Sequence, residues 1–358
     1  MNSNNRLQKL RQKFAEKELD GILISQPENR YYLSGFNGSA GFLLITSSEA
    51  MLATDFRYTE QAAVQAPGYS IFRTTGSLPE WFPGLMGDLK LHSLGFESEQ
   101  VPFSLYQELS VILSKEYPAV RLVPINGVVE SLRAVKEPEE IKFITQAVKI
   151  SDDAFNYIAE TIDAGISEKE LAWEIEKYMR DQGSQSLPFD IIVASGPEAA
   201  MPHHRPGSRI IKSGDTVLID MGAKVNEYTS DLTRTICPGK RSNKAFKKIY
   251  DIVLKAQLAA IEGIKAGMTG AEADSLARNV IAEADHGNAF GHSLGHGIGL
   301  VTHEKPVLGL KSTEILTNGM VFTVEPGIYI SGWGGVRIED TVVMENGKLK
   351  VLSRARKL

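Results

Sequence analysis

The segment Leu218–Asp231, LIDMGAKVNEYTSD, constrains the fold more than any other part of the chain. It places Asp220 and Asp231 on either side of the turn-prone residues KVNE. A turn centred between Val225 and Asn226 puts the two aspartates directly opposite each other on an antiparallel hairpin, with Cβ atoms roughly 5 Å apart. Carboxylates this close raise each other's pKa unless a cation lies between them. The segment therefore predicts a hairpin that binds a metal.

The same pattern returns later in the chain. The sequence GMVFTVEPG at Gly319–Gly327 aligns with GDTVLIDMG at Gly214–Gly222 and places Glu325 at the position of the first aspartate. Glu325 and Glu339 lie at equal distances from Gly332, inside the turn-forming sequence SGWGG. We therefore expect a second hairpin on which two carboxylates face each other.

The helical segments repeat at a similar interval. The sequence IDAGISEKE is followed 102 residues later by IKAGMTGAE, and both contain a capping box, Ser167 with Glu170 and Thr269 with Glu272. Matches at offsets of 102 to 108 residues indicate a duplicated half-domain. Such a duplication would bring four carboxylates together.

A histidine-rich segment lies between the two hairpins. Gly291–Glu304, GHSLGHGIGLVTHE, contains His292, His296 and His303 of the chain's seven histidines. Its glycines favour an extended or looped backbone over a helix and permit close approach to a ligand. A single histidine is most often structural, but three in this position favour an oxygen-rich metal site completed by one imidazole.

The charges of these residues predict two metal ions. Four carboxylates carry −4, which two divalent cations would neutralise in a partly buried cluster. Mn²⁺ suits such ligands best, and Co²⁺, Zn²⁺ and Fe²⁺ stay open. Thr233 and Thr341 each lie two residues beyond a carboxylate and point to the same face, so they are expected to support the metal site from behind the ligands. Arg337, two residues before Glu339, is expected to do the same or to hold a substrate carboxylate.

The length of 358 residues predicts two domains, since single cores rarely grow past about 250–300 residues. Short apolar strands alternate with amphipathic stretches from Arg6 to Pro124, which indicates a small α/β domain. The glycine- and aromatic-rich NRYYLSGFNGSAG is expected to be a structural loop. A boundary near Val123–Gly127 gives domains of residues 1–127 and 128–358.

Composition excludes several classes of partner. A net charge of −5 without a basic run argues against nucleic acid. The amino-terminal residues lack a signal-peptide core, and no apolar run approaches the roughly 18 residues of a membrane span. One cysteine, Cys237, cannot form an internal disulfide, which fits a cytoplasmic protein. Cys237 is expected to be an inert thiol, and His204 and His286 to be surface or packing residues.

The motifs IDMGA…YTSDLTRT, GHSLGHGIGLVTHEKP, GMVFTVEPG and GVRIED resemble those of the metal-dependent Xaa-Pro peptidases, aminopeptidase P and prolidase. The sequence LRAVKEPEEI extends this resemblance back to Leu132. The resemblance implies an α+β chain with a carboxy-terminal pita-bread domain, in which duplicated αβ halves surround a curved antiparallel sheet. A smaller α/β domain would precede it, and the protein would be a homodimer.

The resemblance also implies a set of five metal ligands. Asp220 would chelate one metal ion, Asp231 and Glu339 would bridge both ions, and His296 and Glu325 would hold the other. A hydroxide bridging the two ions would be the nucleophile.

Further residues would act on the substrate, a proline-containing peptide cleaved at its amino-terminal Xaa-Pro bond. Glu325 would shuttle a proton, and His303 would polarise the scissile carbonyl or stabilise its oxyanion. His203 and His292 would line the substrate site. Arg337 matches the family arginine beside the last ligand.

Substrate length and some related activities stay open. Dipeptide-specific members often carry an arginine directly after H-E-x-P to hold a free proline carboxylate, whereas this chain has Val307. We therefore expect an aminopeptidase acting on longer peptides, with prolidase as the alternative. Methionine aminopeptidases usually lack the amino-terminal domain and DLTRT. Creatine amidinohydrolases and non-enzymatic pita-bread binding modules typically lose metal ligands, which this chain retains.

Overall fold

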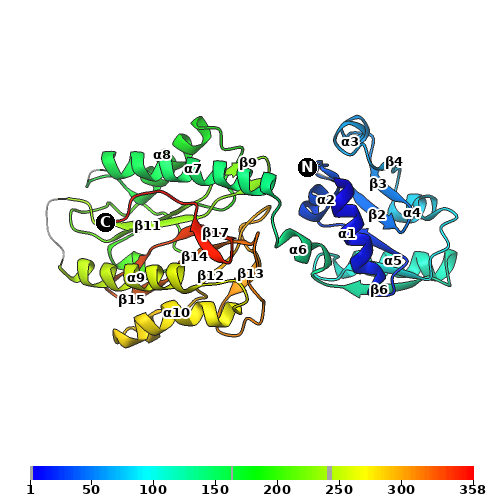
Figure 1. Cartoon of the computed structure of the whole chain (residues 1–358). Coiled ribbons are helices and arrows are strands. Elements are labelled where there is room, and N and C mark those ends of the chain that lie inside the picture. The colour runs from blue at the N-terminus through cyan, green and yellow to red at the C-terminus, as the bar shows by residue number, and fades with distance from the viewer. Residues whose placement is uncertain (1–2, 163, 240–243) are drawn as a thin grey trace. The chain divides into compact units, whose positions relative to one another are not determined.

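The computed structural model describes residues 3–162, 164–239 and 244–358 (Figure 1). Contacts divide the chain into two compact units, Met1–Arg133 and Ala134–Leu358. This division falls after α6 (Val128–Arg133), which packs against α1 (Ser3–Ala15), whereas the limits 1–127 and 128–358 remain the prediction from sequence. None of the described helices is both long enough and apolar enough to cross a bilayer.

The amino-terminal unit is a six-stranded mixed sheet with the strand order β4-β3-β2-β1-β5-β6. The sequence predicts six strands in this unit, and all six are present within two residues at each end. The predicted ranges are Gly21–Ile24, Gly41–Ile45, Met51–Thr54, Tyr69–Phe72, Ser93–Phe96 and Val120–Val123. The elements of this unit after α1 are β1 (Gly21–Ile24), α2 (Pro27–Ser34), β2 (Phe42–Thr46), β3 (Ala50–Thr54), α3 (Thr59–Gln65), β4 (Ser70–Arg73), α4 (Leu78–Met86), β5 (Ser93–Glu97), α5 (Phe103–Glu116), β6 (Arg121–Ile125) and α6.

The expected loop NRYYLSGFNGSAG is wrong in its first half, which belongs to helix α2. Pro27 occupies the first turn, where its missing N–H costs nothing, and Gly35 ends the helix in a left-handed conformation with φ 81°. The buried Arg30 of this helix donates to the carbonyls of Gly41 and Gly38 and so fixes the glycine-rich half. Tyr31 and Tyr32 thus lie on the helix, whereas the buried Phe36 follows its last turn.

The carboxy-terminal unit has two pairs of helices, each followed by antiparallel strands. The first half contains α7 (Pro138–Thr161), α8 (Glu168–Asp181), β7 (Ile192–Ser195), the 3-10 turn η1 (Gly196–Ala200), β8 (Val217–Met221), β9 (Lys224–Val225), β10 (Tyr228–Thr229) and β11 (Leu232–Ile236). The second half contains α9 (Lys244–Gly263), α10 (Gly270–Glu283), η2 (Gly287–Ala289), β12 (Gly295–Gly297), β13 (Glu304–Leu308), β14 (Val321–Val324), β15 (Gly327–Ile330), β16 (Gly334–Arg337), β17 (Asp340–Glu345) and β18 (Lys348–Val351). The sequence predicts a helix over residues 243–264, to which α9 corresponds; the first predicted residue, Asn243, lies outside the described residues.

The two halves form one layered arrangement. Backbone pairing gives a three-stranded sheet, β11-β8-β7, and a five-stranded sheet, β13-β12-β14-β17-β18. Helices α7 and α8 contact the strands of the first half, and α9 and α10 those of the second. Figure 1 shows the two helix pairs on opposite sides of these strands. Both expected capping boxes are present, with the Ser167 and Thr269 hydroxyls accepting from the N–H groups of Glu170 and Glu272.

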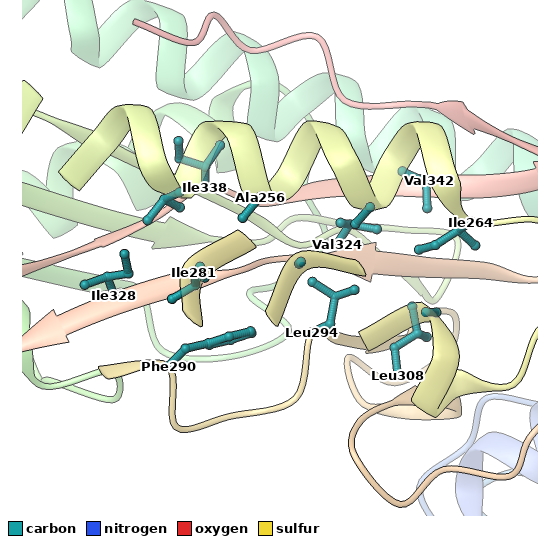
Figure 2. Close-up of a cluster of buried hydrophobic side chains, with 14 of the residues drawn as sticks. Ala256, Ile264, Ile281, Phe290, Leu294, Leu308, Val324, Ile328, Ile338 and Val342 are labelled. Atoms are coloured by element: carbon teal, nitrogen blue, oxygen red, sulfur yellow. The ribbon is translucent and has the colours of Figure 1, made fainter. Parts of the chain in front are cut away.

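Each half has its own apolar core. In the second half, Ala256 of α9, Ile281 of α10 and Val324 of β14 meet in one buried cluster (Figure 2). In the first half, Phe155 of α7, Ile175 of α8 and Ile219 of β8 do the same. The strands that carry the acidic motifs are thus backed by packed apolar layers, which fix the positions of their backbones.

Two leucines in the carboxy-terminal unit test this account of the core. Leu316 is fully buried in the second cluster, whereas Leu310 is 68% exposed. We expect Leu316→Ala to lower the free energy of unfolding by about 2–5 kcal/mol, because it leaves a cavity. Leu310→Ala is the matched control and should change it by less than about 0.5 kcal/mol. Urea unfolding followed by circular dichroism measures both, and equal effects would contradict the assignment of the core.

Candidate metal centre

The first hairpin carries Asp220 and Asp231 with a register different from the expected one. Asp220 lies opposite Thr233, so the prediction that it opposes Asp231 is wrong by two residues. The turn consists of Asn226 and Glu227, whose φ angles are 48° and 67°. A two-residue hairpin turn of this kind needs positive φ at both positions, which the predicted turn residue valine would not adopt. Because the shift is even, both aspartates still point to the same face.

The second hairpin confirms its predicted register. Strands β15 and β16 pair Gly327 with Arg337, and Gly332 lies at the turn with a φ of 78°. Strands β14 and β17 continue the same register, so Glu325 falls opposite Glu339. The glycine-rich turn, read from the sequence, therefore sets the position of two of the predicted ligands.

The histidine-rich segment is extended around His296, as expected. Strand β12 pairs with β13 and β14 and has Gly295 and Gly297 on either side of the histidine. A Cβ at Gly295 would lie 2.0 Å from the carbonyl oxygen of Thr323, and one at Gly297 would lie 2.0 Å from that of Lys305. The glycines therefore allow the backbone that carries His296 to lie close to the neighbouring strands.

All five predicted ligands converge. The ligand atoms of Asp231, His296 and Glu339 lie within 4.8 Å of one another. The Nε2 atom of His296 is 3.2 Å from Oε1 of Glu325 and 3.6 Å from Oδ2 of Asp231. Asp220 is close enough for its charge to raise the pKa of Asp231. Strands from both halves thus supply one compact acidic cluster.

The hydrogen bond at Nδ1 of His296 leaves Nε2 as the atom that could bind a metal ion. Its Nδ1 atom lies 3.1 Å from the carbonyl oxygen of Gly297, which can only accept, so Nδ1 carries the proton. Nε2 then faces the carboxylates. A backbone carbonyl that fixes the imidazole in this way is typical of metal-bound histidines.

Threonines hold the carboxylates from behind. The hydroxyl of Thr233 donates to Oε2 of Glu339 at 2.7 Å, as the sequence predicted. Thr341, the second predicted support, instead donates to the backbone carbonyl of Asp231 at 3.0 Å. Thr323 donates to Oε1 of Glu325 at 2.9 Å and was not singled out, although it lies two residues before Glu325 on the same face of the strand.

Arg337 lies within the protein and holds ligand residues. Its side chain is 5% exposed, and its Nη2 atom donates to Oδ2 of Asp220 at 2.5 Å. Its Nε atom donates to the Thr233 hydroxyl at 3.0 Å, and its Nη1 atom to the Tyr329 hydroxyl at 2.9 Å. With these donors engaged, the geometry favours the supporting role over the capture of a substrate carboxylate.

Tyr329 is a residue of this centre that the sequence analysis missed. Burial raises the pKa of its hydroxyl to about 12, and the hydroxyl lies 2.9 Å from Nε2 of His292. The Nδ1 atom of His292 lies 2.8 Å from the Ser293 carbonyl, so Nδ1 carries the proton and Nε2 accepts from Tyr329. The spacing Glu325, Gly327, Tyr329 was the available signal, since alternate residues of a strand share a face.

The other two predicted substrate histidines lie beside the cluster. The ring centroid of His303 is 4.2 Å from that of His296. Burial and the charge of His296 lower the pKa of His303, and His203 is near enough to add to this effect. His203 and His303 are exposed, whereas the acidic residues behind them are not. Both imidazoles therefore lie at the solvent-exposed margin of the acidic cluster.

The electrostatics of the cluster fit a bound cation. Burial, then the charges of Glu339 and Asp220, raises the pKa of Asp231 well above its usual range, and burial does the same for Glu339. Atoms Oδ1 of Asp220 and Oε1 of Glu339 are buried and have no hydrogen-bond partner among the described residues. Buried carboxylate oxygens normally have a donor or a metal. These two oxygens therefore suit direct ligation of a divalent ion.

His296 and Glu325 form an ion pair inside the cluster. Burial disfavours the charged form of each, but their mutual hydrogen bond and attraction outweigh it. The pKa of His296 is raised to about 9 and that of Glu325 is lowered to about 2. The proton on His296 thus offsets part of the negative charge where a cation would otherwise lie.

A second cluster with the right residue types is Glu168, Glu198 and His204. The two oxygens of Glu168 already accept four hydrogen bonds from protein groups, two at each oxygen. A carboxylate with this many donors has no lone pair left for a metal. The half-buried Cys237 also fits its expected inert role, because burial raises the pKa of its thiol.

Substitution of a glycine next to His296 tests the close approach of the strands. We expect Gly295→Ala to destabilise the protein by about 1–3 kcal/mol, because its methyl group would overlap the backbone of Thr323. Gly291→Ala in the same segment is the control, since no described atom lies within 4 Å of its Cβ. Urea unfolding measures the free energy of unfolding of both variants. Equal values would contradict the close approach, because they would show that β12 can move away from β14 at no cost.

Comparison with known proteins identifies the family of the chain. Residues 142–346 match Metallopeptidase family M24, and residues 6–135 match the Creatinase/Prolidase N-terminal domain. The chain is 37% identical over 361 residues to the Xaa-Pro dipeptidase of Pyrococcus horikoshii, with 99% of each chain covered.

Solved structures are similar over the whole chain. The Xaa-Pro dipeptidase from Bacillus anthracis has a TM-score of 0.95 and 43% identity, covering 100% of this chain and 99% of the other. The X-Pro aminopeptidase from Thermotoga maritima has a TM-score of 0.88 and 36% identity, covering 97% and 99%. The chain has the predicted fold, a pita-bread domain after a smaller α/β domain. The chain therefore belongs to metallopeptidase family M24.

Proposed function

We propose that this peptidase hydrolyses the amino-terminal Xaa-Pro bond of peptides, with activity on Xaa-Pro dipeptides as the alternative. The observation that carries the proposal is the convergence of four carboxylates and one imidazole, with two buried carboxylate oxygens that lack a donor among the described residues. The names of the relatives, Xaa-Pro dipeptidase and X-Pro aminopeptidase, support the substrate class.

The proposed cofactor is a pair of divalent ions, with Mn²⁺ preferred because oxygen ligands dominate. Asp220 would hold one ion, His296 and Glu325 the other, and Asp231 and Glu339 both. When bound, such ions lower the pKa of water to give a nucleophile at neutral pH and polarise a carbonyl. Charges of +4 and −4 would then balance in a buried site.

The residues of the chain would orient the substrate and move a proton. An Xaa-Pro bond is a tertiary amide without an N–H, and its nitrogen must gain a proton to leave. Glu325 is the proposed carrier of that proton, held by the Thr323 hydroxyl. His303 would donate a hydrogen bond to the scissile carbonyl, and His203 and His292 would line the site. Arg337 would keep Asp220 in place.

A groove beside His292 supports longer peptides. It has a volume of about 1020 Å³, and its lining includes Phe290, Val307 and Leu310. Val307 is 44% exposed and offers no charge to a free proline carboxylate. A groove of this size suits residues that follow the proline.

The homodimer and the cytoplasmic location remain predictions. Size-exclusion chromatography with light scattering measures whether the protein is a dimer.

Metal binding can be measured without a substrate. We expect Mn²⁺ added to chelator-treated protein to raise its melting temperature, since a ligand at 100 times its Kd stabilises by about 2.7 kcal/mol. Asp231→Asn and Glu339→Gln should abolish most of this shift. Glu345→Gln, at an exposed position on β17, should keep it. A full shift in Asp231→Asn would refute the proposed ligand set.

Substrate length can be measured with two peptides. We expect a higher kcat/KM on Ala-Pro-Ala than on Ala-Pro, because Val307 provides no partner for the dipeptide's carboxylate. Val307→Arg should move this ratio about tenfold towards Ala-Pro by adding a charge-assisted contact. Ala-Ala-Ala is the control for proline specificity. Preference of the unaltered protein for Ala-Pro would favour prolidase, and cleavage of neither proline peptide with Mn²⁺ or Co²⁺ would refute the proposed function.

A further inference from the structure

We propose that Glu168 is a positioning residue that places His203 for the substrate by holding both ends of the segment Ser195–Gly207. This inference rests on the role proposed above for His203 in lining the substrate site. Glu168 is the first residue of α8 and has no exposed surface. It is neither a predicted metal ligand nor close to one in sequence.

The contacts of Glu168 join two points that are twelve residues apart in the sequence. Its Oε1 atom accepts from the N–H of Ser195 at 2.8 Å and from the Ser195 hydroxyl at 2.6 Å. Its Oε2 atom lies 2.9 Å from Nε2 of His204 and accepts from the N–H of Gly207 at 3.1 Å. One buried carboxylate therefore closes the segment on itself, and hydrogen bonds to a charged acceptor are the stronger kind.

Local structure does not account for this carboxylate. The capping box at the start of α8 is made by Ser167 and Glu170, so Glu168 is not needed to cap the first turn of the helix. A fully buried glutamate is costly unless its bonds compensate for the lost hydration. All four hydrogen bonds of the Glu168 carboxylate go to the segment Ser195–Gly207. The buried charge therefore maintains the position of this segment.

The segment carries His203 beside the metal centre. The carbonyl of Pro202 accepts from Nη1 of Arg337 at 3.5 Å, and the N–H of His204 donates to the carbonyl of Met201 at 3.2 Å. The backbone of His203 is thus fixed on one side by the Arg337 contact and on the other by the bond between His204 and Glu168. Its own imidazole is exposed next to His303. A shift of this backbone would displace the imidazole from the substrate without touching a ligand.

The first test replaces the charge alone. We expect Glu168→Gln to raise KM for Ala-Pro-Ala about tenfold while kcat changes less than twofold, because the loosened segment weakens substrate binding. The shift in melting temperature with Mn²⁺ should stay as in the unaltered protein. Glu170→Gln is the matched control, since Glu170 lies two residues along the same helix and its carboxylate accepts from Ser167 alone among the residues that the structure describes. A KM unchanged in Glu168→Gln, or raised equally in Glu170→Gln, would overturn the inference.

A second variant tests the same contact without altering the buried charge. His204→Ala removes one donor to Glu168 and should raise KM about threefold to tenfold. His204→Gln places an amide N–H near the position of Nε2 and should restore most of the binding. Failure of glutamine to improve on alanine would contradict a role for this hydrogen bond.

A double-mutant cycle shows whether the effect passes through His203. His203→Ala should raise KM by itself, and Glu168→Gln added to it should raise KM no further. If the two effects multiply instead, Glu168 does not act through His203, and only the positioning role is overturned. If His203→Ala leaves KM unchanged, the proposed substrate role of His203 fails and the inference fails with it.

Discussion

Repulsion between buried carboxylates is the constraint on which the carboxy-terminal unit depends. Burial and mutual charge raise the pKa of Asp231 and of Glu339, and two carboxylate oxygens lack a donor among the described residues. Such a cluster is stable only if the strands that carry the carboxylates are held together and if cations can reach the carboxylates from solvent. The paired helices and apolar cores behind the strands meet the first condition. His203 and His303, which lie beside the cluster and are exposed to solvent, are consistent with the second.

One buried arginine joins the strands that carry this charge. Arg234 is 1% exposed and donates to the carbonyls of Thr233 and Glu339, to the Asp340 carboxylate and to the carbonyl of Ala355. It thereby connects β11 of the first half, β17 of the second and the carboxy-terminal residues. Because its partners are mostly backbone groups, it fixes main-chain position and leaves the ligand carboxylates free. Threonine hydroxyls, in contrast, bond directly to Glu339 and Glu325.

Local sequence rules succeeded where glycine or capping chemistry decides the structure. The turn at Gly332 and the capping boxes of α8 and α10 are correct because few residues satisfy those geometries. The register of the first hairpin differs from the expected one because KVNE allows a turn at Val225–Asn226 or at Asn226–Glu227. Only the second is possible sterically, since valine is excluded from positive φ. Helix α2 differs from the expected loop because the glycines that indicate a loop follow the helix, and Pro27 and Gly35 begin and end it.

The sequence alone determined the five candidate ligands, the duplicated halves and the family of metal-dependent peptidases that the motifs resemble. The four carboxylates and the duplication follow from residue type and spacing, whereas the choice of His296 among the histidines follows from the resemblance of the motifs. Only the tertiary structure decided that Arg337 faces inward to Asp220, that Tyr329 joins Arg337 to His292, and that Glu168 holds the segment bearing His203. These contacts link residues far apart in the chain, and packing of the two halves sets their distances.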